Sequence, residues 1–543
     1  MKTKYICVTG GVISGLGKGL TAAALGKSLI MAGYTVTAIK LDPYLNIDPG
    51  TMSPYQHGEV FVTKDGAETD LDLGHYERFL DIELTKDNSI TSGQVYKEIL
   101  DSERTGFFLG GTVQVVPHVT NLVIDKILKF DDKFDFVLVE VGGTVGDIEA
   151  DIFLESIRQL RIRVGMDRVA YVHLGLLIEL PGGEIKTKAM QHSVKTLMSK
   201  GITPDFLVCR SLYGPVNDSI LGKLSKLCGI DKVRIIQNYN VSPIYKIVEQ
   251  FHSQTFPFKL LNFFGEEYMY EQIEKSVKRL EIWKSIYNKP KNKYFKIAIV
   301  GKYTDLNDSY ISVIEAINAA SENIATVDLI DAETINEQNV DRILYEYSGI
   351  LVPGGFGDRG IEGMIVTTNY CIENNKPYFG ICLGMQILII AALRKHFPDA
   401  NSEEFDKNTH HPVIHIMKNQ QYIEQIGGSM RLGDYECNFS DSKSLAKQAY
   451  GEEEIVERHR HRYEFNNTFF NGIDNYSKYL RQEGFKLSGW NDSTGEMLLE
   501  IIEKGDNILG CQFHPEFKSR PDRPHPLFKL FINNAKKYFN ELD

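Results

Sequence analysis

The sequence predicts an α/β protein with two large domains, each built on an open parallel sheet. Two stretches carry this prediction, residues 5–32 and residues 377–394. In both, a short apolar run typical of a buried strand leads through glycines into a helical pattern, which is the repeating unit of open α/β sheets. The chain has 543 residues, too many for one core when domains average about 150 residues.

We expect a first domain over residues 1–269 and a second over residues 294–543, joined by residues 270–293. The joining segment begins with helical periodicity of mixed charge over residues 270–287. It ends in a polar, proline-containing stretch over residues 288–293, which is typical of a linker.

Composition excludes several classes of function. Hydrophobic residues make up 43% and charged residues 24%, which is ordinary for a soluble enzyme, and the net charge is -12. This acidity argues against broad binding to nucleic acid or to anionic membranes. No apolar segment is long enough for a bilayer span or a signal peptide, and the seven cysteines include no C-x-x-C pair. We expect a cytoplasmic protein with no nucleic-acid or membrane partner.

The first predicted strand runs into a glycine-rich loop over residues 10–21 that contains Lys18. Glycines let backbone N–H groups crowd around phosphate oxygens, the lysine adds a positive charge, and the following helix N-terminus adds its dipole. The loop departs from the standard P-loop, in which Ser or Thr follows the lysine. A plain glycine-rich turn is the alternative reading.

Charged residues stand where further predicted strands end. Lys40 ends the strand over residues 36–40, and Glu140 follows the strand over residues 135–139. Ligands of open α/β sheets bind at this edge. Asp72 belongs to an acidic run, which is usually only a solvated face, but Asp72 and Glu140 could together hold Mg²⁺ against nucleotide phosphates.

Cys382 lies between Gly380 and Gly384 at a predicted turn from strand to helix. This is the pattern of a nucleophile elbow, and a helix N-terminus favours a thiolate. A buried structural cysteine is the alternative, which the flanking glycines disfavour. Far downstream, His514 and Glu516 end another apolar run, so that the carboxylate can orient an imidazole that activates the thiol.

The residues 380–384 together with His514 and Glu516 resemble the class I glutamine amidotransferase domain. The resemblance implies that glutamine is hydrolysed through a thioester at Cys382, releasing ammonia, with Cys382, His514 and Glu516 catalytic. Gly355, in a glycine loop that follows another strand, would supply an oxyanion-hole N–H. The implied glutamine-binding residues are Gly355, Leu383, Gly384, Met385, Gln386, Glu404 and Arg462.

Five blocks of the first half resemble the CTP synthase family and occur in that family's order: residues 10–19, 40–44, 56–63, 70–79 and 142–149. The resemblance implies a P-loop-like amidoligase domain followed by a flavodoxin-like glutamine amidotransferase domain. In this family ATP phosphorylates the O4 oxygen of UTP, and ammonia then displaces the phosphate to give CTP. A glutamine amidotransferase of the cobyric acid synthase type, or a filament-forming protein without catalysis, are the alternatives.

The same resemblance assigns the nucleotide sites. The ATP-binding residues are Gly15, Leu16, Gly17, Lys18, Gly19, Leu20, Lys40 and Asp72. The UTP-binding residues, at a site shared with the inhibitor CTP, are Ser14, Asp147, Ile148, Glu149, Lys186, Thr187, Lys188, Gln191 and Lys223. Asp72 and Glu140 would hold Mg²⁺.

The family further implies GTP as an allosteric activator and a homotetramer built as a dimer of dimers, with which filament assembly is compatible. One departure stands out in the segment from Lys186 to Gln191. The family usually has a proline there, and this chain has Ala189 and Met190. The stretch over residues 174–183 also differs from familiar members.

Overall fold

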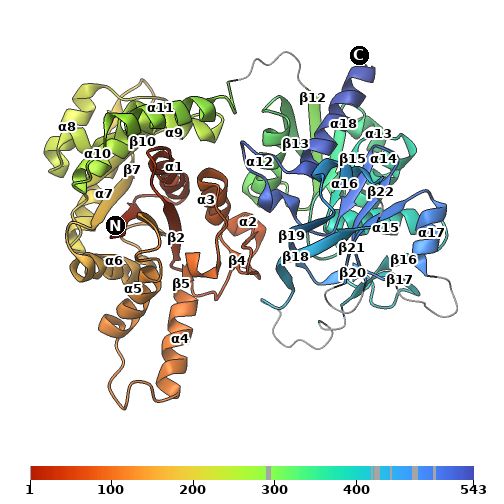
Figure 1. The fold of residues 1–543 in the computed structure, drawn as a ribbon, viewed down its shortest axis with the longest axis horizontal. Coiled ribbons are helices and arrows are strands. Elements are labelled where there is room, and N and C mark those ends of the chain that lie inside the picture. Colours follow the sequence, from red (N-terminus) through yellow and green to blue (C-terminus); the bar gives the residue numbers. More distant parts are fainter. Residues whose placement is uncertain are drawn as a thin grey trace. The chain divides into compact units, whose positions relative to one another are not determined.

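The computed structural model describes residues 2–288, 295–417, 420, 428–440, 443–467, 475–492 and 497–542. The chain divides into two compact units (Figure 1). Unit 1 comprises Met1–Asp48 and Asp72–Asn288, and unit 2 comprises Pro49–Leu71 and Lys289–Asp543. Most of the linker expected over residues 288–293 lies outside the described residues.

This division differs from the expected one in two places. The helix α11 (Tyr270–Lys284), expected in the joining segment, belongs to unit 1 because Trp283 is buried and donates to the carbonyl of Tyr245 at 3.0 Å. Residues 49–71, expected in the first domain, belong to unit 2. Arg458 donates to the carbonyl of Val62 at 3.1 Å, and the amide of Asp434 donates to the carbonyl of Lys64 at 2.9 Å.

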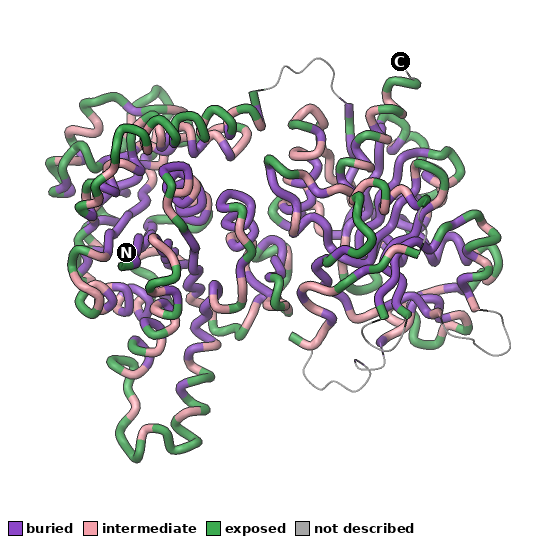
Figure 2. The backbone as a smooth tube through the Cα atoms, in the orientation of Figure 1, coloured by how far each residue is buried: buried purple, intermediate pink, exposed green. Residues whose placement is uncertain are grey.

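Unit 1 is built on a seven-stranded sheet in the order β11-β10-β7-β1-β6-β2-β5, and all its pairings are parallel. The strands are β1 (Lys4–Gly10), β2 (Val36–Asp42), β5 (Ser89–Thr91), β6 (Phe136–Val141), β7 (Val169–Leu176), β10 (Phe206–Ser211) and β11 (Ile235–Tyr239). Strands β1, β2 and β6 are buried throughout, as expected for a parallel sheet covered on both faces (Figure 2). The chain reverses its direction of winding beside β1, which places the ligand crevice at the carboxyl end of that strand.

The helices of unit 1 are α1 (Lys18–Met31), α3 (Asp72–Leu80), α4 (Ser92–Arg104), α5 (Thr120–Leu128), α6 (Asp151–Val164), α7 (Lys188–Ser199), α8 (Asp218–Cys228), α9 (Ile247–Ser253), α10 (Phe256–Phe263) and α11. A short hairpin of β8 (Ile178–Glu179) and β9 (Ile185–Lys186) precedes α7. Among the described residues, no helix has the length and apolar character that crossing a membrane requires.

Unit 2 contains a nine-stranded sheet in the order β13-β12-β14-β15-β23-β22-β21-β18-β19. The parallel part comprises β12 (Phe295–Gly301), β13 (Ala325–Asp331), β14 (Gly349–Val352), β15 (Tyr378–Ile381) and β23 (Ile508–Cys511). The antiparallel part comprises β18 (Arg431–Phe439), β19 (Glu454–His461), β21 (Lys486–Asn491) and β22 (Leu498–Lys504). The expected parallel sheet is therefore extended by antiparallel strands, because the short turn between β22 and β23 can join only antiparallel neighbours.

Smaller strands and the helices complete unit 2. The small strands are β3 (Phe61–Val62), β4 (Glu68–Thr69), β16 (Ala400–Ser402), β17 (His411–Ile416) and β20 (Tyr463–Phe465). The helices are α2 (Pro54–His57), α12 (Ile311–Ala320), α13 (Val340–Leu344), α14 (Ile361–Glu373), α15 (Leu383–Leu393), α16 (Leu445–Tyr450), α17 (Tyr476–Gln482) and α18 (Pro526–Leu542). Every residue of α15 is buried, so this helix is the centre of the core on which the candidate thiol site is mounted.

Candidate active sites

Cys382 occupies the turn between β15 and α15 with φ 52° and ψ -103°, a conformation that is strained for a residue with a side chain. Its amide donates to the carbonyl of Cys511 at 2.7 Å. A Cβ atom on Gly384 would overlap the carbonyl oxygen of Val352, and one on Gly380 would lie 2.5 Å from the carbonyl oxygen of Gly384. Both flanking glycines are therefore required for the turn that presents the thiol.

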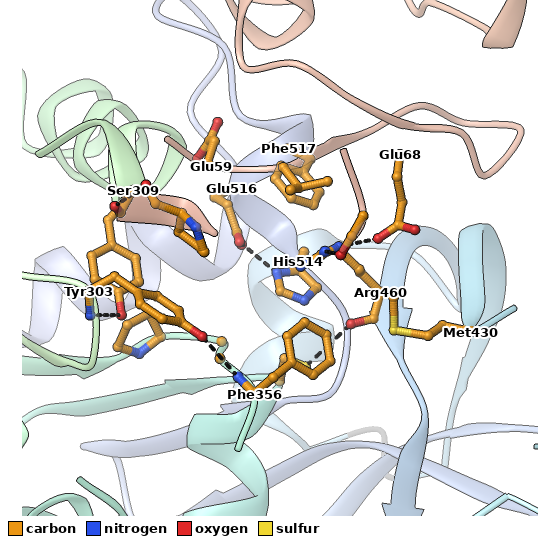
Figure 3. Close-up of a pocket in the computed structure, with 18 of the residues that line it drawn as sticks. Glu59, Glu68, Tyr303, Ser309, Phe356, Met430, Arg460, His514, Glu516 and Phe517 are labelled. Atoms are coloured by element: carbon orange, nitrogen blue, oxygen red, sulfur yellow. Dashed lines mark hydrogen bonds and ion pairs between the residues drawn. The ribbon is translucent and has the colours of Figure 1, made fainter. Parts of the chain in front are cut away.

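The imidazole of His514 and the thiol of Cys382 face the same space. Nδ1 of His514 is held by Oε1 of Glu516 at 2.7 Å, which leaves Nε2 as the nitrogen that can act on the thiol (Figure 3). A Cβ atom on Gly354 would lie 3.6 Å both from Cβ of Cys382 and from Nε2 of His514. The ring of Phe517 stacks on the imidazole with centroids 5.2 Å apart and fixes its plane.

The electrostatics of this group favour a charged imidazole. Burial alone would lower the pKa of His514, but the carboxylate of Glu516 and the sulfur of Cys382 outweigh it and raise the pKa to about 10. An imidazolium beside a sulfur favours the thiolate, which is the nucleophilic form of cysteine.

A cavity of about 580 Å³ opens beside the thiol. Glu404 and Arg462 line it, which brings a carboxylate and a guanidinium into the same space as Cys382 and His514. Glu404 accepts the amide of Gly357 at 2.7 Å, and burial raises the pKa of this carboxyl. Opposite charges at two places in one cavity suit a zwitterionic amino acid such as glutamine.

Of the other residues expected to bind glutamine, only one lines the cavity among the described residues. Gly355 lines the cavity, and a Cβ atom on it would lie 3.4 Å from the side chain of Leu383. The residues Leu383, Gly384, Met385 and Gln386 are buried in the first turns of α15 and are not among the described residues that line the cavity. They can act on a ligand through the N-terminus of the helix rather than through their side chains.

Sequence reasoning missed two partners of the thiol. Nε2 of Gln512 lies 3.6 Å from the sulfur of Cys382, and the sulfur lies 3.9 Å from the carbonyl oxygen of Arg460. A polar glutamine inside the apolar run that ends at His514 was the available signal for the first contact. No local pattern marks the second.

Residues 49–71 form part of the cavity wall, which the expected domain division did not foresee. Arg460 pairs with Glu68 at 2.8 Å and donates to the carbonyl of Gly50 at 3.2 Å, and its neighbour two residues earlier, Arg458, holds Val62 (Figure 3). The carbonyl of Arg458 in turn accepts the amide of His514 at 2.7 Å. Strand β19 thus contacts residues 49–71 with its side chains and the catalytic candidates with its backbone.

In unit 1 the glycine-rich loop connects β1 to α1. Gly15 and Gly17 have positive φ values of 68° and 91°, which a side chain would strain. Lys18 is buried, donates to the carbonyl of Gly143 at 2.7 Å, and has a pKa lowered by burial. A Cβ atom on Gly19 would overlap Oδ1 of Asp72, so this carboxylate lies directly against the loop.

Lys40, Asp72 and Glu140 meet beside this loop, although they are far apart in sequence. Nζ of Lys40 pairs with Asp72 and, at 2.9 Å, with Glu140. Lys40 holds the pKa of Asp72 below its usual value despite burial, whereas burial and the neighbouring Asp72 raise the pKa of Glu140. Two carboxylates that converge on one cation form a donor set that fits Mg²⁺, which binds few protein oxygens beside water and phosphate.

The residues expected to contact UTP follow the carboxyl ends of neighbouring strands. Ser14 follows β1, Asp147, Ile148 and Glu149 follow β6, Lys186, Thr187, Lys188 and Gln191 lie between β7 and the second turn of α7, and Lys223 lies in α8 after β10. The side chain of Gln191 donates to Thr187 at 2.8 Å. Each of these segments therefore begins at the carboxyl edge of the parallel sheet, where the glycine-rich loop also begins.

Met190, which lies in the segment where the family usually has a proline, packs against Gly175. Met190 is fully buried, and its Sδ atom lies 2.7 Å from the position that a Cβ atom on Gly175 would occupy. The two departures noted in the sequence, at residues 174–183 and 189–190, thus pack against each other in space.

Sequence reasoning missed a buried histidine, His173, which lies between β1 and α7. His173 contacts Thr9 through Nδ1 at 2.9 Å and Ser193 through Nε2 at 2.7 Å, so it connects β1 with α7. Burial lowers its pKa to about 3, which keeps the ring neutral.

Comparison with known proteins covers nearly the whole chain. Residues 4–265 match the family described as CTP synthase N-terminus, and residues 305–534 match glutamine amidotransferase class-I. The CTP synthase of Treponema denticola is 49% identical over 551 residues, which cover 98% of this chain and 99% of the relative. The CTP synthase of Clostridium beijerinckii is 46% identical over 549 residues, with the same coverage.

Among solved structures, the glutaminase domain of Trypanosoma brucei CTPS with bound acivicin is 34% identical, with a TM-score of 0.41. The match covers 45% of this chain and 94% of the solved domain. The matches to both family descriptions, and the full-length identity to the curated relatives, lead to one conclusion. The chain belongs to the CTP synthase family.

Proposed function

We propose that Cys382, His514 and Glu516 release ammonia from glutamine, and that Lys18, Lys40 and the carboxylates beside them serve its transfer to UTP. The reaction of the family is the glutamine-dependent amination of UTP to CTP with ATP. The observation that carries the residue assignment is the strained thiol turn, set against an imidazole–carboxylate pair in a cavity that offers both charges of an amino acid.

In the glutaminase half-reaction, the proton of the Cys382 thiol already lies on His514, and the thiolate attacks the side-chain amide carbon of glutamine. The oxygen of the tetrahedral intermediate becomes negative and is stabilised by N–H groups of Gly355 and Leu383. His514 then gives its proton to the departing nitrogen, which leaves as ammonia, and a thioester remains. Water, deprotonated by His514, attacks the thioester, and glutamate leaves as the thiol is restored.

In the amidoligase half-reaction, the backbone of residues 15–20 binds the phosphates of ATP, and Lys18 and Lys40 offset negative charge as the γ-phosphoryl group passes to O4 of UTP. Asp72 and Glu140 would hold Mg²⁺, which supplies positive charge at the phosphate oxygens when it is bound. Ammonia then adds at C4 of the pyrimidine, and inorganic phosphate leaves with the former O4 oxygen. The loops that carry Ser14, residues 147–149, residues 186–191 and Lys223 would bind UTP, and CTP as inhibitor.

The proposal extends to regulation and assembly: GTP activates glutamine hydrolysis, CTP inhibits, and the protein is a cytoplasmic homotetramer. For assembly, the support is a set of exposed apolar side chains in the second half of α4 and in the segment that follows it. Leu100 is 61%, Phe107 74% and Leu109 94% exposed, with Val115 and Val116 also exposed. Exposed apolar side chains that gather in one region mark protein contacts. Sedimentation of the wild type and of Leu109→Glu, with and without ATP and UTP, tests it.

The experiment that tests the catalytic assignment follows conversion of UTP to CTP by absorbance, with ATP and Mg²⁺, in the wild type and in Cys382→Ala. We expect the variant to lose about 10⁴-fold or more of the glutamine-dependent rate, because it lacks the nucleophile, and to keep the ammonium-dependent rate. Adding GTP to the wild type should raise only the glutamine-dependent rate. Retention of glutamine-dependent synthesis by Cys382→Ala would disprove the assignment.

A further inference from the structure

Lys302 directly follows β12 and is only 1% exposed, yet it carries an ammonium group. Its Nζ donates to the carbonyl oxygen of Phe356 at 3.2 Å and to that of Gly357. These two carbonyls belong to residues 354–357, which we call the oxyanion loop. The buried cation therefore holds two consecutive peptide groups of this loop from one side.

The opposite edge of the same peptides is also held. The amide of Gly357 donates to Glu404 at 2.7 Å, and the amide of Phe356 donates to the hydroxyl of Tyr303 at 3.4 Å (Figure 3). The peptide between Phe356 and Gly357 thus has its carbonyl on Lys302 and its N–H on Glu404. It cannot rotate without losing both contacts, and each involves a charged group, for which a lost hydrogen bond is most costly; of the two groups, the ammonium of Lys302 is buried.

The fixed peptides directly follow Gly354 and Gly355, the residues of the loop that lie nearest to Cys382 and His514. A Cβ atom on Gly354 would touch His514 and Cys382, and one on Gly355 would lie 3.4 Å from Cδ of Lys302. The aliphatic stem of Lys302 therefore packs behind Gly355 while its ammonium group holds the next two residues. Because Gly355 directly precedes the held peptides and lies against this stem, loss of Lys302 would free Gly355 to move relative to Cys382.

The backbone of Lys302 is itself anchored, so the side chain starts from a defined position. Its amide donates to the hydroxyl of Tyr310 at 3.0 Å, and its carbonyl accepts from the hydroxyl of Tyr55 at 2.6 Å and from Arg359. Burial lowers the pKa of Lys302 to about 8, with Glu404 opposing this effect, so the group is mostly an ammonium at neutral pH.

We propose that Lys302 is a positioning residue of the glutaminase reaction, which orients the oxyanion loop so that it stabilises the tetrahedral intermediate at Cys382. The inference rests on the proposed function of Cys382 and deepens it. Lys302 does not touch the reacting atoms. It acts through the carbonyl groups of Phe356 and Gly357, and so it should affect the transition state more than the binding of glutamine.

The test compares the wild type, Lys302→Met and Lys302→Arg. Methionine keeps the apolar stem but removes every donor, whereas arginine keeps the charge. For Lys302→Met we expect kcat of glutamine hydrolysis to fall by about 10²-fold, as for loss of an oxyanion contact, with KM changed by less than about threefold. Lys302→Arg should recover part of kcat. Ammonium-dependent CTP synthesis and alkylation of Cys382 by iodoacetamide should stay at wild-type rates.

Lys376 provides a matched control within unit 2. It is also 1% exposed, its pKa is also lowered to about 8 by burial, and its Nζ also donates to two backbone carbonyls, those of Leu344 at 2.6 Å and Tyr345 at 3.0 Å. It does not line the cavity. Lys376→Met should lower the melting temperature as Lys302→Met does, but leave kcat of glutamine hydrolysis unchanged.

An aldehyde analogue of glutamine gives a direct readout, because it adds to the thiol as a tetrahedral species with an oxygen in the oxyanion position. Lys302→Met should weaken binding of this analogue by about the factor lost in kcat. If Lys302→Met does not fold, Tyr303→Phe removes the hydroxyl that accepts the Phe356 amide and should lower kcat in the same way, by a smaller factor.

The proposal is overturned if Lys302→Met keeps kcat and analogue affinity within twofold of the wild type, or if Lys376→Met loses as much kcat. Cys382→Ala in the same assays distinguishes failure of the proposed function from failure of the role proposed for Lys302. If Cys382→Ala still hydrolyses glutamine, the proposed function fails. If Cys382→Ala is inactive and Lys302→Met is unaffected, only the role of Lys302 fails.

Discussion

The charged side chains of the two candidate sites are arranged differently. In unit 2, one imidazole and one carboxylate form a pair beside a thiol, and the uncharged ring of Phe517 stacks on the imidazole. In unit 1, Lys40 and two carboxylates form a cluster of mutual ion pairs. The first arrangement orients groups for covalent chemistry, while the second gathers charges that can exchange partners with a triphosphate and a cation.

The comparison also separates two uses of glycine. Around Cys382, glycines are required by close approach, because the backbone of β14 leaves no space for a Cβ atom on Gly384 and that of α15 leaves none on Gly380. In the glycine-rich loop of unit 1, Gly15 and Gly17 have open space around them and are required by their positive φ values. A crowded turn presents a single atom, whereas an open loop presents a row of N–H groups to a ligand.

Within unit 1, the largest effect is expected from Asp72→Asn. The substitution removes a carboxylate from the proposed Mg²⁺ donor set and a partner from Lys40, so CTP synthesis should fall by about 10³-fold with either glutamine or ammonium. Steady-state rates with both nitrogen sources check this. The control is Asp87→Asn, an exposed partner of Lys129, which should leave both rates unchanged. Equal loss in both variants would show that the effect is not local.

A smaller, pH-dependent effect is expected from Glu516→Gln in the other site. In the wild type, His514 stays charged until the pH approaches its pKa of about 10. Without the carboxylate, the largest influence that raises the pKa of His514 is gone, and the pKa falls. The alkaline limb of glutamine hydrolysis should therefore move to lower pH, and kcat at neutral pH should drop by about 10²-fold. A pH profile of kcat measures both.

The raised pKa of His514 also makes the free energy of unfolding depend on pH. Because the folded pKa of His514 lies above its usual value of 6.5, its contribution to stability is fully present below about pH 6.5 and is lost as the pH rises through about 10. Unfolding by urea across this range should show a smaller alkaline loss of stability for Glu516→Gln than for the wild type. An unchanged profile would mean that Glu516 does not set the pKa of His514.

The smallest effect concerns the packing pair of unit 1. Gly175→Ala should destabilise unit 1 by about 1–3 kcal/mol and raise KM for UTP a fewfold, because a methyl group would press on Met190 and displace α7. In Met190→Ala the same substitution at Gly175 should cost about 1 kcal/mol less, since the space is then free. Urea unfolding of the four proteins of this cycle gives the coupling. Additive effects would show that the two positions do not share their space.

Much of the architecture could be predicted from sequence because it is encoded by neighbours in the chain. Strand, glycine turn and helix at residues 5–32 and 377–394 follow from apolar periodicity and from the backbone freedom of glycine, both of which are local properties. The parallel sheet then brings Lys40 and Glu140 to one edge, because the carboxyl ends of parallel strands coincide. The elbow at Cys382 and the pair of His514 with Glu516 could be predicted for the same reason, since each is a short-range pattern.

Other features were decided only by the tertiary structure. Residues 49–71 pack in unit 2 because Arg458 and Arg460, about 400 residues further along the chain, hold their carbonyls and carboxylates. The contacts of Gln512 with the thiol and of Lys302 with the oxyanion loop likewise join distant segments.

The sequence alone thus determined the α/β elements, the thiol turn, the glycine-rich loop and the family resemblance. Which segments pack together, and which buried charge holds residues 354–357, depended on the folded chain. Such contacts arise from the matching of side-chain surfaces after the sheets have formed, and no periodicity or spacing of nearby residues encodes that matching.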